Sequence, residues 1–211
     1  DALPILYDFA NVIGSVYADN LIGDDQDNMF AGLGGSGGFG DTIEGGEGSN
    51  TVNYSTMPDI TGGITVDLND VQSDDYVHLT YVKDGIATTD YLQSIQNVIG
   101  TTGADHISGD NEFNNVITGL GGTSSEGDTL EGGSGENTVS YLGMRAYSGV
   151  TLDLTETPDQ DGFIHASYIR VPYTSATTDS LSGFTNVIGS SGDDSITGDG
   201  QDNVIEGVGG N

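Results

Sequence analysis

The sequence predicts an all-β protein in which short parallel strands stack as a β-roll or β-helix solenoid, with β-hairpins that project from it. Three observations predict this fold. An apolar residue follows an Asp or Asn two positions later at regular intervals, Gly-rich runs separate these pairs, and the whole pattern recurs along the 211 residues. A short strand between Gly-rich turns cannot bury its apolar face alone, so it has to stack on its neighbours.

The longest repeat is marked by the tetrapeptide NVIG, which begins at Asn11, Asn97 and Asn186. The sequences after the three copies match one another, and the first two copies also share ATTDYL or ATTDSL further on. We therefore expect two modules, the start of a third and the end of a preceding repeat, within a longer protein. The expected boundaries are 1–10 (preceding repeat), 11–96 (roll 11–54, excursion 55–96), 97–185 (roll 97–141, excursion 142–185) and 186–211 (third module).

A shorter repeat of about nine residues lies inside each module. Runs rich in Gly, Asp and Asn suit tight turns with positive φ, and a central Ile, Leu or Val suits a very short strand. Because such a linkage of polar and apolar residues is not expected of a disordered linker, we predict an ordered stack. The Asp or Asn and its apolar partner are Asp19/Leu21, Asn28/Phe30, Asp41/Ile43, Asn50/Val52, Asp105/Ile107, Asn115/Ile117, Asp128/Leu130, Asn137/Val139, Asp194/Ile196 and Asn203/Ile205.

The first member of these pairs alternates between Asp and Asn, so one edge of the stack is expected to carry Asp and the other Asn. Stacked carboxylates repel one another, and calcium between them would remove the repulsion and also accept carbonyl ligands. Stacked Asn amides can bond to their neighbours without metal. We therefore predict several Ca2+ ions on the Asp edge. The predicted ligands there are Asp19, Asp41, Asp105, Asp128 and Asp194, with four-residue insertions at Gly35 and Gly122 that bulge outward or add carbonyl oxygens.

A rival hypothesis places calcium on the Asn edge as well. It rests on further acidic residues in those turns, which are Asp24, Asp27, Asp110, Asp199 and Asp202.

Charge and composition exclude several classes of partner. The chain has 33 acidic and 3 basic residues, a net charge of -30, and its only cations are Lys83, Arg145 and Arg170. Nucleic acids and anionic membranes attract clustered Lys and Arg, so neither is an expected partner. The absence of Cys excludes disulfides and thiolate metal sites, and no apolar run is long enough to span a bilayer.

Two nonapeptides carry a family resemblance: GGEGSNTVN at Gly45–Asn53 and GGSGENTVS at Gly132–Ser140. They resemble the repeats-in-toxin (RTX) motif Gly-Gly-x-Gly-x-Asp-x-apolar-x, with Asn in the Asp place. The longer module is similar to the hemolysin-type calcium-binding regions of large secreted bacterial proteins. This resemblance covers nearly the whole chain and implies a parallel β-roll, calcium-dependent folding and type I secretion.

The two excursions depart from the short repeat. Residues Ile64–Leu68 and Val150–Leu154 alternate apolar and polar side chains, which predicts strands with one buried face. The run YVHLTYVKDGIATTDYL predicts a hairpin with Asp84-Gly85 as its turn, and the counterpart in the second module has VPY at the tip. The acidic loops NDVQSDDY and TETPDQDGF lack the EF-hand pattern and are expected to be solvated.

Three pairs of residues recur at matching places of the excursions, namely His78/His165, Tyr81/Tyr168 and Lys83/Arg170. One interpretation is a strip that binds sugar or a partner surface. The interpretation we favour is cross-strand pairing, with the cations balancing nearby acids.

No catalytic pattern is present: we find no His-Glu-x-x-His motif, nucleophile elbow or phosphate loop. We therefore expect a non-enzymatic, structural or adhesive module of an extracellular or cell-surface bacterial protein, of the adhesin or surface-layer type. We expect the module to fold when it binds calcium outside the cell. The other expected partners of the module are polysaccharide or neighbouring repeats of the same protein. The alternative is an accessory module of a secreted polysaccharide-modifying or hydrolytic enzyme.

Overall fold

The computed structural model describes residues 10–35, 37–57, 60–122, 126–144, 146–170 and 175–210. Every regular element in these ranges is a β-strand, which confirms the all-β prediction. Among the described residues no helix is long and apolar enough to cross a membrane. Residues 1–9, which make up most of the expected preceding repeat, and the VPY tip lie outside the described residues.

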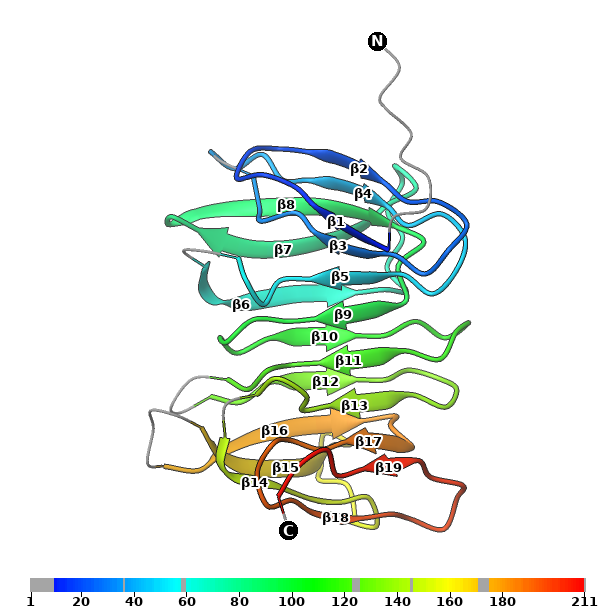
Figure 1. Ribbon diagram of the computed structural model, residues 1–211, viewed down its shortest axis with the longest axis vertical. Helices are drawn as coiled ribbons and strands as arrows, with labels where there is room; N and C mark the ends of the chain where they lie inside the picture. The colour runs from blue at the N-terminus through cyan, green and yellow to red at the C-terminus, as the bar shows by residue number, and fades with distance from the viewer. Residues whose placement is uncertain are drawn as a thin grey trace.

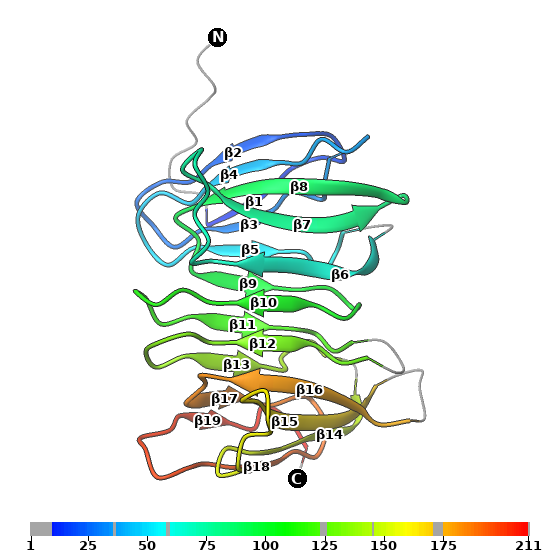
Figure 2. The same ribbon diagram turned by 180° about the vertical axis from the view of Figure 1, so that it is seen from behind.

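The strands form two sheets (Figures 1 and 2). The first, here called the parallel sheet, contains β1 (Asn11–Ile13), β3 (Met29–Ala31), β5 (Thr51–Asn53), β9 (Asn97–Ile99), β11 (Val116–Thr118), β13 (Thr138–Ser140), β17 (Asn186–Ile188) and β19 (Ile205–Glu206), in that order. The second, the mixed sheet, contains β2 (Asn20–Ile22), β4 (Thr42–Glu44), β6 (Ile60–Asp67), β7 (Val77–Lys83), β8 (Ile86–Gln93), β10 (His106–Ser108), β12 (Thr129–Glu131), β14 (Ala146–Asp153), β15 (Ile164–Arg170), β16 (Thr177–Ser182) and β18 (Ser195–Thr197).

The chain passes from one sheet to the other at nearly every turn, and each three-residue strand pairs in parallel with the next strand of its own sheet. The register places the middle residues opposite each other, as with Leu21 and Ile43 in β2 and β4. Neighbouring side chains of a strand point to opposite faces, so the middle side chain points inward while its two neighbours point outward. Ile43, Val52, Ile107 and Leu130 are almost completely buried in a single hydrophobic core.

The excursions do not project as free hairpins, which corrects that part of the expected fold. In the mixed sheet the strands lie in the order β2-β4-β8-β7-β6-β10-β12-β16-β15-β14-β18. The last strand of the first excursion, β8, therefore pairs with β4, and its first strand, β6, pairs with β10. The physical reason is burial: alternate residues of β7, including Val77, Leu79 and Tyr81, are buried in the same core as the short strands.

The hairpin turn forms where the sequence predicts it. Asp84 and Gly85 have φ values of 53° and 76°, which is the conformation of a type I′ turn. The strands on either side, β7 and β8, pair in antiparallel register from Val77↔Leu92 to Lys83↔Ile86. They are longer than the three-residue strands, and their turn extends past the stack at the left edge of Figure 1.

The buried middle residues are expected to dominate stability. Leu130→Ala should lower the free energy of unfolding by about 2–5 kcal/mol, because Leu130 is fully buried and its removal leaves a cavity. Val116→Ala, at a position that is 39% exposed on β11, should cost less than about 1 kcal/mol. Urea unfolding of both variants tests this, and equal costs would contradict the inward orientation of the middle residues.

Candidate functional site

The turns at the two edges of the stack carry different polar residues. The Asp of each pair precedes a strand of the mixed sheet, whereas Asn precedes a strand of the parallel sheet. The Asp turns lie toward the left in Figure 1 and the Asn turns toward the right. We call the first set the Asp column; it contains the predicted Asp19, Asp41, Asp105, Asp128 and Asp194, and also Asp90 and Asp179.

Every carboxylate in the Asp column except that of Asp19, which accepts from Ser15 in its own turn, accepts a hydrogen bond from the backbone of the neighbouring strand. The N–H of Asp19 donates to Oδ1 of Asp41 at 2.9 Å, and the N–H of Asp41 donates to Oδ1 of Asp90 at 2.8 Å. The second module repeats this arrangement with Asp105, Asp128 and Asp179, at 2.9 and 2.8 Å. The antiparallel strands separate these two runs, so Asp105 and Asp194 accept from the N–H groups of Ile64 and Val150 instead.

Several of these carboxylates also cap their own turn. Oδ2 of Asp105 accepts from the N–H of Thr101 at 2.8 Å, and Oδ1 accepts from the Thr101 hydroxyl at 2.8 Å. The same contacts join Ser190 to Asp194. This geometry explains the Gly of NVIG, because a Cβ at Gly100 would lie only 2.4 Å from Oδ2 of Asp105.

Asp90 and Asp179 are members of the Asp column that the sequence analysis does not identify. Each is fully buried, and each lies two residues before a buried Leu, at Leu92 and Leu181, which is the spacing of the short repeat. That spacing, within the repeated ATTD segment, could have identified them. Because the excursion was interpreted as a separate hairpin, its Asp residues were not assigned to the same column.

Two tyrosines donate to the buried Asp90. The hydroxyl of Tyr54 lies 2.7 Å from Oδ2, and the hydroxyl of Tyr81 lies 2.9 Å from Oδ1. The rings of Tyr54 and Tyr81 are 6.1 Å apart. Most of the short repeats have Gly at the position of Tyr54. The Tyr at this position supplies a hydrogen-bond donor to Asp90 in the Asp column.

The second module has the same cluster with one difference. Tyr168 donates to Oδ1 of Asp179 at 2.7 Å, and its ring is 5.9 Å from that of Tyr141. The Tyr141 hydroxyl is close enough to offset part of the rise that burial causes in the pKa of Asp179, but it forms no hydrogen bond with that carboxylate. Oδ2 of Asp179 consequently has no hydrogen-bond partner among the described residues.

Lys83 is buried beside the first cluster. Its ammonium group donates to the carbonyl oxygens of Leu33 and Gly34 at 2.9 and 2.7 Å. Burial raises the pKa of Asp90, and the Lys83 charge partly offsets that rise. His78 lies on the opposite face of β7, where its ring packs edge-on against Tyr91 at 4.9 Å. His78 does not share a face with Tyr81 and Lys83, so the interpretation as one ligand-binding strip is wrong for this module. The interpretation as cross-strand pairs is confirmed, with His78 opposite Tyr91 and Lys83 near Asp90.

Burial of the Asp column makes ionisation costly. Burial raises the pKa of Asp41 to about 7, and the charges of Asp90 and Asp19 add to the rise, while the Asp19 amide partly offsets it. Burial also raises the pKa of Asp105 and Asp179 to about 6 and raises that of Asp128. Lys83 is the only Lys or Arg among the side chains that the structure describes, so these buried carboxylates are short of positive charge.

The fit of calcium to the Asp column is only partial. In its favour, the buried Oδ2 atoms of Asp41 and Asp179 have no hydrogen-bond partner among the described residues. Within the described ranges, however, no three Asp, Glu or His side chains converge on one point. Ions here would need backbone carbonyls, as calcium sites in turns do.

The insertions present amide groups to the core at the two predicted Gly positions. The N–H of Gly122 donates to the Tyr168 hydroxyl at 3.1 Å. Burial raises the pKa of Tyr81, and the N–H of Gly35 partly offsets that rise. A role of their carbonyl oxygens as calcium ligands stays a prediction.

The Asn edge forms a matching column without charge. The N–H of Asn28 donates to Oδ1 of Asn50 at 3.0 Å, and the N–H of Asn115 donates to Oδ1 of Asn137 at 2.8 Å. Nδ2 of Asn137 donates to the carbonyls of Ser134 and Gly183, both at 3.1 Å. The side-chain amide thus lies between two carbonyl oxygens and donates to both.

The acids of the rival hypothesis lie in the turns of the Asn edge and are engaged with backbone amides. Asp24, Asp110 and Asp199 each accept an N–H from the residue two positions later, and Asp27 accepts the N–H of Ser49 in the next turn at 2.7 Å. Asp202 is exposed. The structure does not bring these acids together into a cluster of three among the described residues.

No model of a known protein family matches the chain, and none of the curated proteins compared with it gives a significant match. The resemblance to RTX proteins therefore continues to rest on the residues of the repeats.

The raised pKa values predict that the metal-free protein is stabilised by mild acid. A carboxyl with a higher pKa in the folded than in the unfolded state binds protons more tightly when folded. Its contribution to stability is therefore lost as pH rises from about 4 to about 7. In calcium-free buffer, the folded fraction measured by circular dichroism should be larger near pH 5 than near pH 8, and the urea midpoint of the folded protein should be higher. A midpoint that rises across this interval would contradict the burial of unneutralised carboxylates.

Two isosteric variants separate charge from hydrogen bonding. Asp41→Asn at about pH 8 and low calcium should stabilise the fold by about 1–3 kcal/mol, because it removes a buried charge and places an amide where Oδ2 has no partner. Asp105→Asn should gain less or lose stability, because both oxygens of Asp105 already accept hydrogen bonds. Urea unfolding of both variants provides the comparison, and an equal effect would show that charge alone matters.

Proposed function

We propose that the chain is a calcium-stabilised parallel β-roll, a repeat module with a structural or adhesive role in a large secreted or cell-surface protein. The observation that carries the proposal is the Asp column. Five of its seven carboxylates are buried, in two stacked runs, with Lys83 as the only cation among the described side chains. Buried charges without partners are costly, so the fold at neutral pH needs either bound protons or bound cations.

Calcium suits this need better than magnesium. Calcium accepts six to eight oxygen ligands at irregular angles, whereas magnesium requires near-octahedral geometry and retains its water. Gly-rich turns with positive φ before Asp41 and Asp128, at Gly34, Gly37, Gly38 and Gly121, provide the flexible carbonyl-rich surroundings that calcium tolerates. We place the ions on the Asp column, with Asp41 as the first candidate ligand because one of its oxygens has no partner.

The same electrostatics supply a folding switch. At the low calcium concentrations inside a cell, 33 acidic residues favour the extended chain through mutual repulsion. At extracellular concentrations of about 1 mM, sites in the weak-affinity range would fill and drive folding. Type I secretion, an extracellular location and the absence of catalysis belong to the same proposal and follow from the RTX resemblance.

Calcium dependence can be measured directly on the chain. Chelator at about pH 8 should greatly reduce the far-ultraviolet circular dichroism of the β-structure and the protection of the Val52, Val98 and Val139 amides against hydrogen exchange. Addition of calcium should restore both signals cooperatively, and magnesium at the same concentration should not. A chain that keeps full amide protection in chelator would show that the Asp column needs no ion.

A variant on the other edge serves as the matched control. Asn137→Asp replaces a donor by a carboxylate facing the carbonyls of Ser134 and Gly183. In chelator this variant should be less stable than the parent chain, and calcium should restore it with one additional bound ion by isothermal titration calorimetry. If calcium fails to restore it, the turns of the Asn edge do not have the geometry of a calcium site.

A further inference from the structure

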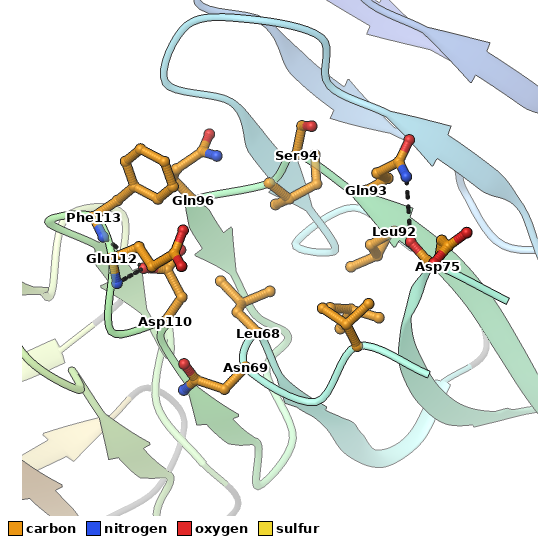
Figure 3. A pocket seen from close by; sticks show the side chains of 13 residues that line it. Leu68, Asn69, Asp75, Leu92, Gln93, Ser94, Gln96, Asp110, Glu112 and Phe113 are labelled. Carbon is orange, nitrogen blue, oxygen red and sulfur yellow. Dashed lines mark hydrogen bonds between the residues drawn. The ribbon is translucent and has the colours of Figure 1, made fainter. Parts of the chain in front are cut away.

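A cleft of about 290 Å³ lies at the Asn edge of the first module (Figure 3). Three segments distant in sequence form it: the loop between β6 and β7, the connection from β8 to β9, and the turn between β10 and β11. These segments meet because β6 pairs with β10 while β8 lies on the other side of β7. The cleft is therefore a product of the reversed strand order of the excursion.

The floor of the cleft is apolar and its rim is acidic. Leu68, Val77, Leu92 and Ile95 form the floor and are buried by the surrounding chain. Phe113 stands on one wall and is 53% exposed. Figure 3 shows Phe113, Glu112 and Asp110 on one side of the cleft and Asp75 with Gln93 on the other, with Leu68 and Leu92 between them.

Two of the rim carboxylates are available to a ligand. Asp110 caps its turn by accepting the N–H groups of Glu112 and Phe113 at 2.9 and 2.7 Å. The carboxylates of Glu112 and Asp75 accept no hydrogen bond from the described residues. The Asp75 loop is held in place, because Nε2 of Gln93 donates to the Asp75 carbonyl at 3.2 Å and Asp75 itself adopts a left-handed φ of 68°.

A ligand for this cleft must be apolar along one part and cationic at one end. The lining contains three acids and no base, and Lys83 is buried elsewhere. A Lys or Arg side chain has this form, because its aliphatic stem covers apolar surface while its charged head stays near water. An aromatic ring beside the head adds a cation–π attraction, which Phe113 can supply. A sugar could form hydrogen bonds only at the rim, where Asn69, Gln93, Ser94 and Gln96 lie beside the acids, and not along the apolar floor.

We propose that this cleft binds a Lys or Arg side chain presented by a basic segment of another polypeptide. Its volume is near the lower limit of ligand pockets, which suits one side chain better than a larger ligand. A second copy of this chain is a poor partner, because it carries 33 acidic and 3 basic residues and the two copies would repel. The proposal is independent of the calcium role, since it requires only that the chain be folded.

The repeat itself indicates one such site in the chain. The turn that supplies Glu112 and Phe113 reads GDNEFNN, with one residue more than its counterparts GDDQDN and GDGQDN. Neither counterpart contains Phe or Glu. The longer turn thus carries a Phe and a Glu only where the first excursion provides the apolar floor.

The experiment is a methyl NMR titration of the folded chain in saturating calcium. The probe is Nα-acetyl-lysine methylamide, and its Nζ-acetylated form is the neutral control. We expect saturable shifts of the Leu68, Val77, Leu92 and Ile95 methyls with the cationic probe, at an affinity of about 1 mM or weaker, and at least about tenfold weaker binding of the neutral probe. Equal binding of both probes, or shifts confined to other methyls, would overturn the proposal.

Variants at the rim separate charge from ring. Glu112→Gln combined with Asp75→Asn should weaken binding of the cationic probe by about three- to tenfold. Phe113→Leu should weaken it by about two- to fivefold, since it keeps apolar area but removes the ring. Glu136→Gln, which removes an exposed acid from a turn outside the cleft, should leave the affinity unchanged. If all three affinities equal that of the parent chain, the cleft is not the site.

Two further arms distinguish other occupants. Maltose replaces the lysine probe in one arm, and the calcium concentration is raised further in the second. Saturable shifts of the floor methyls with maltose but none with lysine would identify a sugar site and overturn the proposal. Displacement of lysine by calcium would assign the rim carboxylates to a metal and would equally overturn it.

Discussion

The hydrogen bond from a backbone N–H to a side-chain oxygen in the next turn is the contact on which the rest of this structure depends. A three-residue strand contributes few ladder hydrogen bonds, and the amide at its start would lack an acceptor without help from a side chain. Asp and Asn provide that acceptor at opposite edges, at 2.8 Å for both Asp128 to Asp179 and Asn115 to Asn137. The stack is therefore joined along four lines: two sheets and two columns of side chains.

The two columns solve one geometric problem with opposite electrical consequences. An Asn side chain accepts with its oxygen and donates with its nitrogen, so Asn137 also donates to Ser134 of its own turn and to Gly183 of the next, and it carries no charge. An ionised Asp side chain accepts only, and when it is buried it carries a charge that the core solvates poorly, so burial raises its pKa. Around Asp90, two tyrosine hydroxyls compensate as hydrogen-bond donors, and the nearby Lys83 ammonium compensates through its charge.

Repetition made much of this architecture predictable from the sequence. The spacing of Asp or Asn to an apolar residue located the short strands, their buried middle residues and the separation of the two edges, because each depends on neighbours a few residues apart. The position of β8 beside β4 was not predictable in this way, since the pairing depends on a contact formed after a long detour of the chain. The same detour concealed Asp90 and Asp179, although their spacing to Leu92 and Leu181 follows the short repeat.

The reversed strand order of the excursions bears on how the stack is assembled. In a simple repeat protein each strand can pair with the strand that precedes it in the sequence. Folding can therefore propagate from one repeat to the next. Here β6 emerges before the strands that separate it from β4, and its parallel neighbour β10 follows later still. Stacking beyond β4 therefore requires a whole excursion and the next turn to be present. We infer that the protein folds in steps of about one module each.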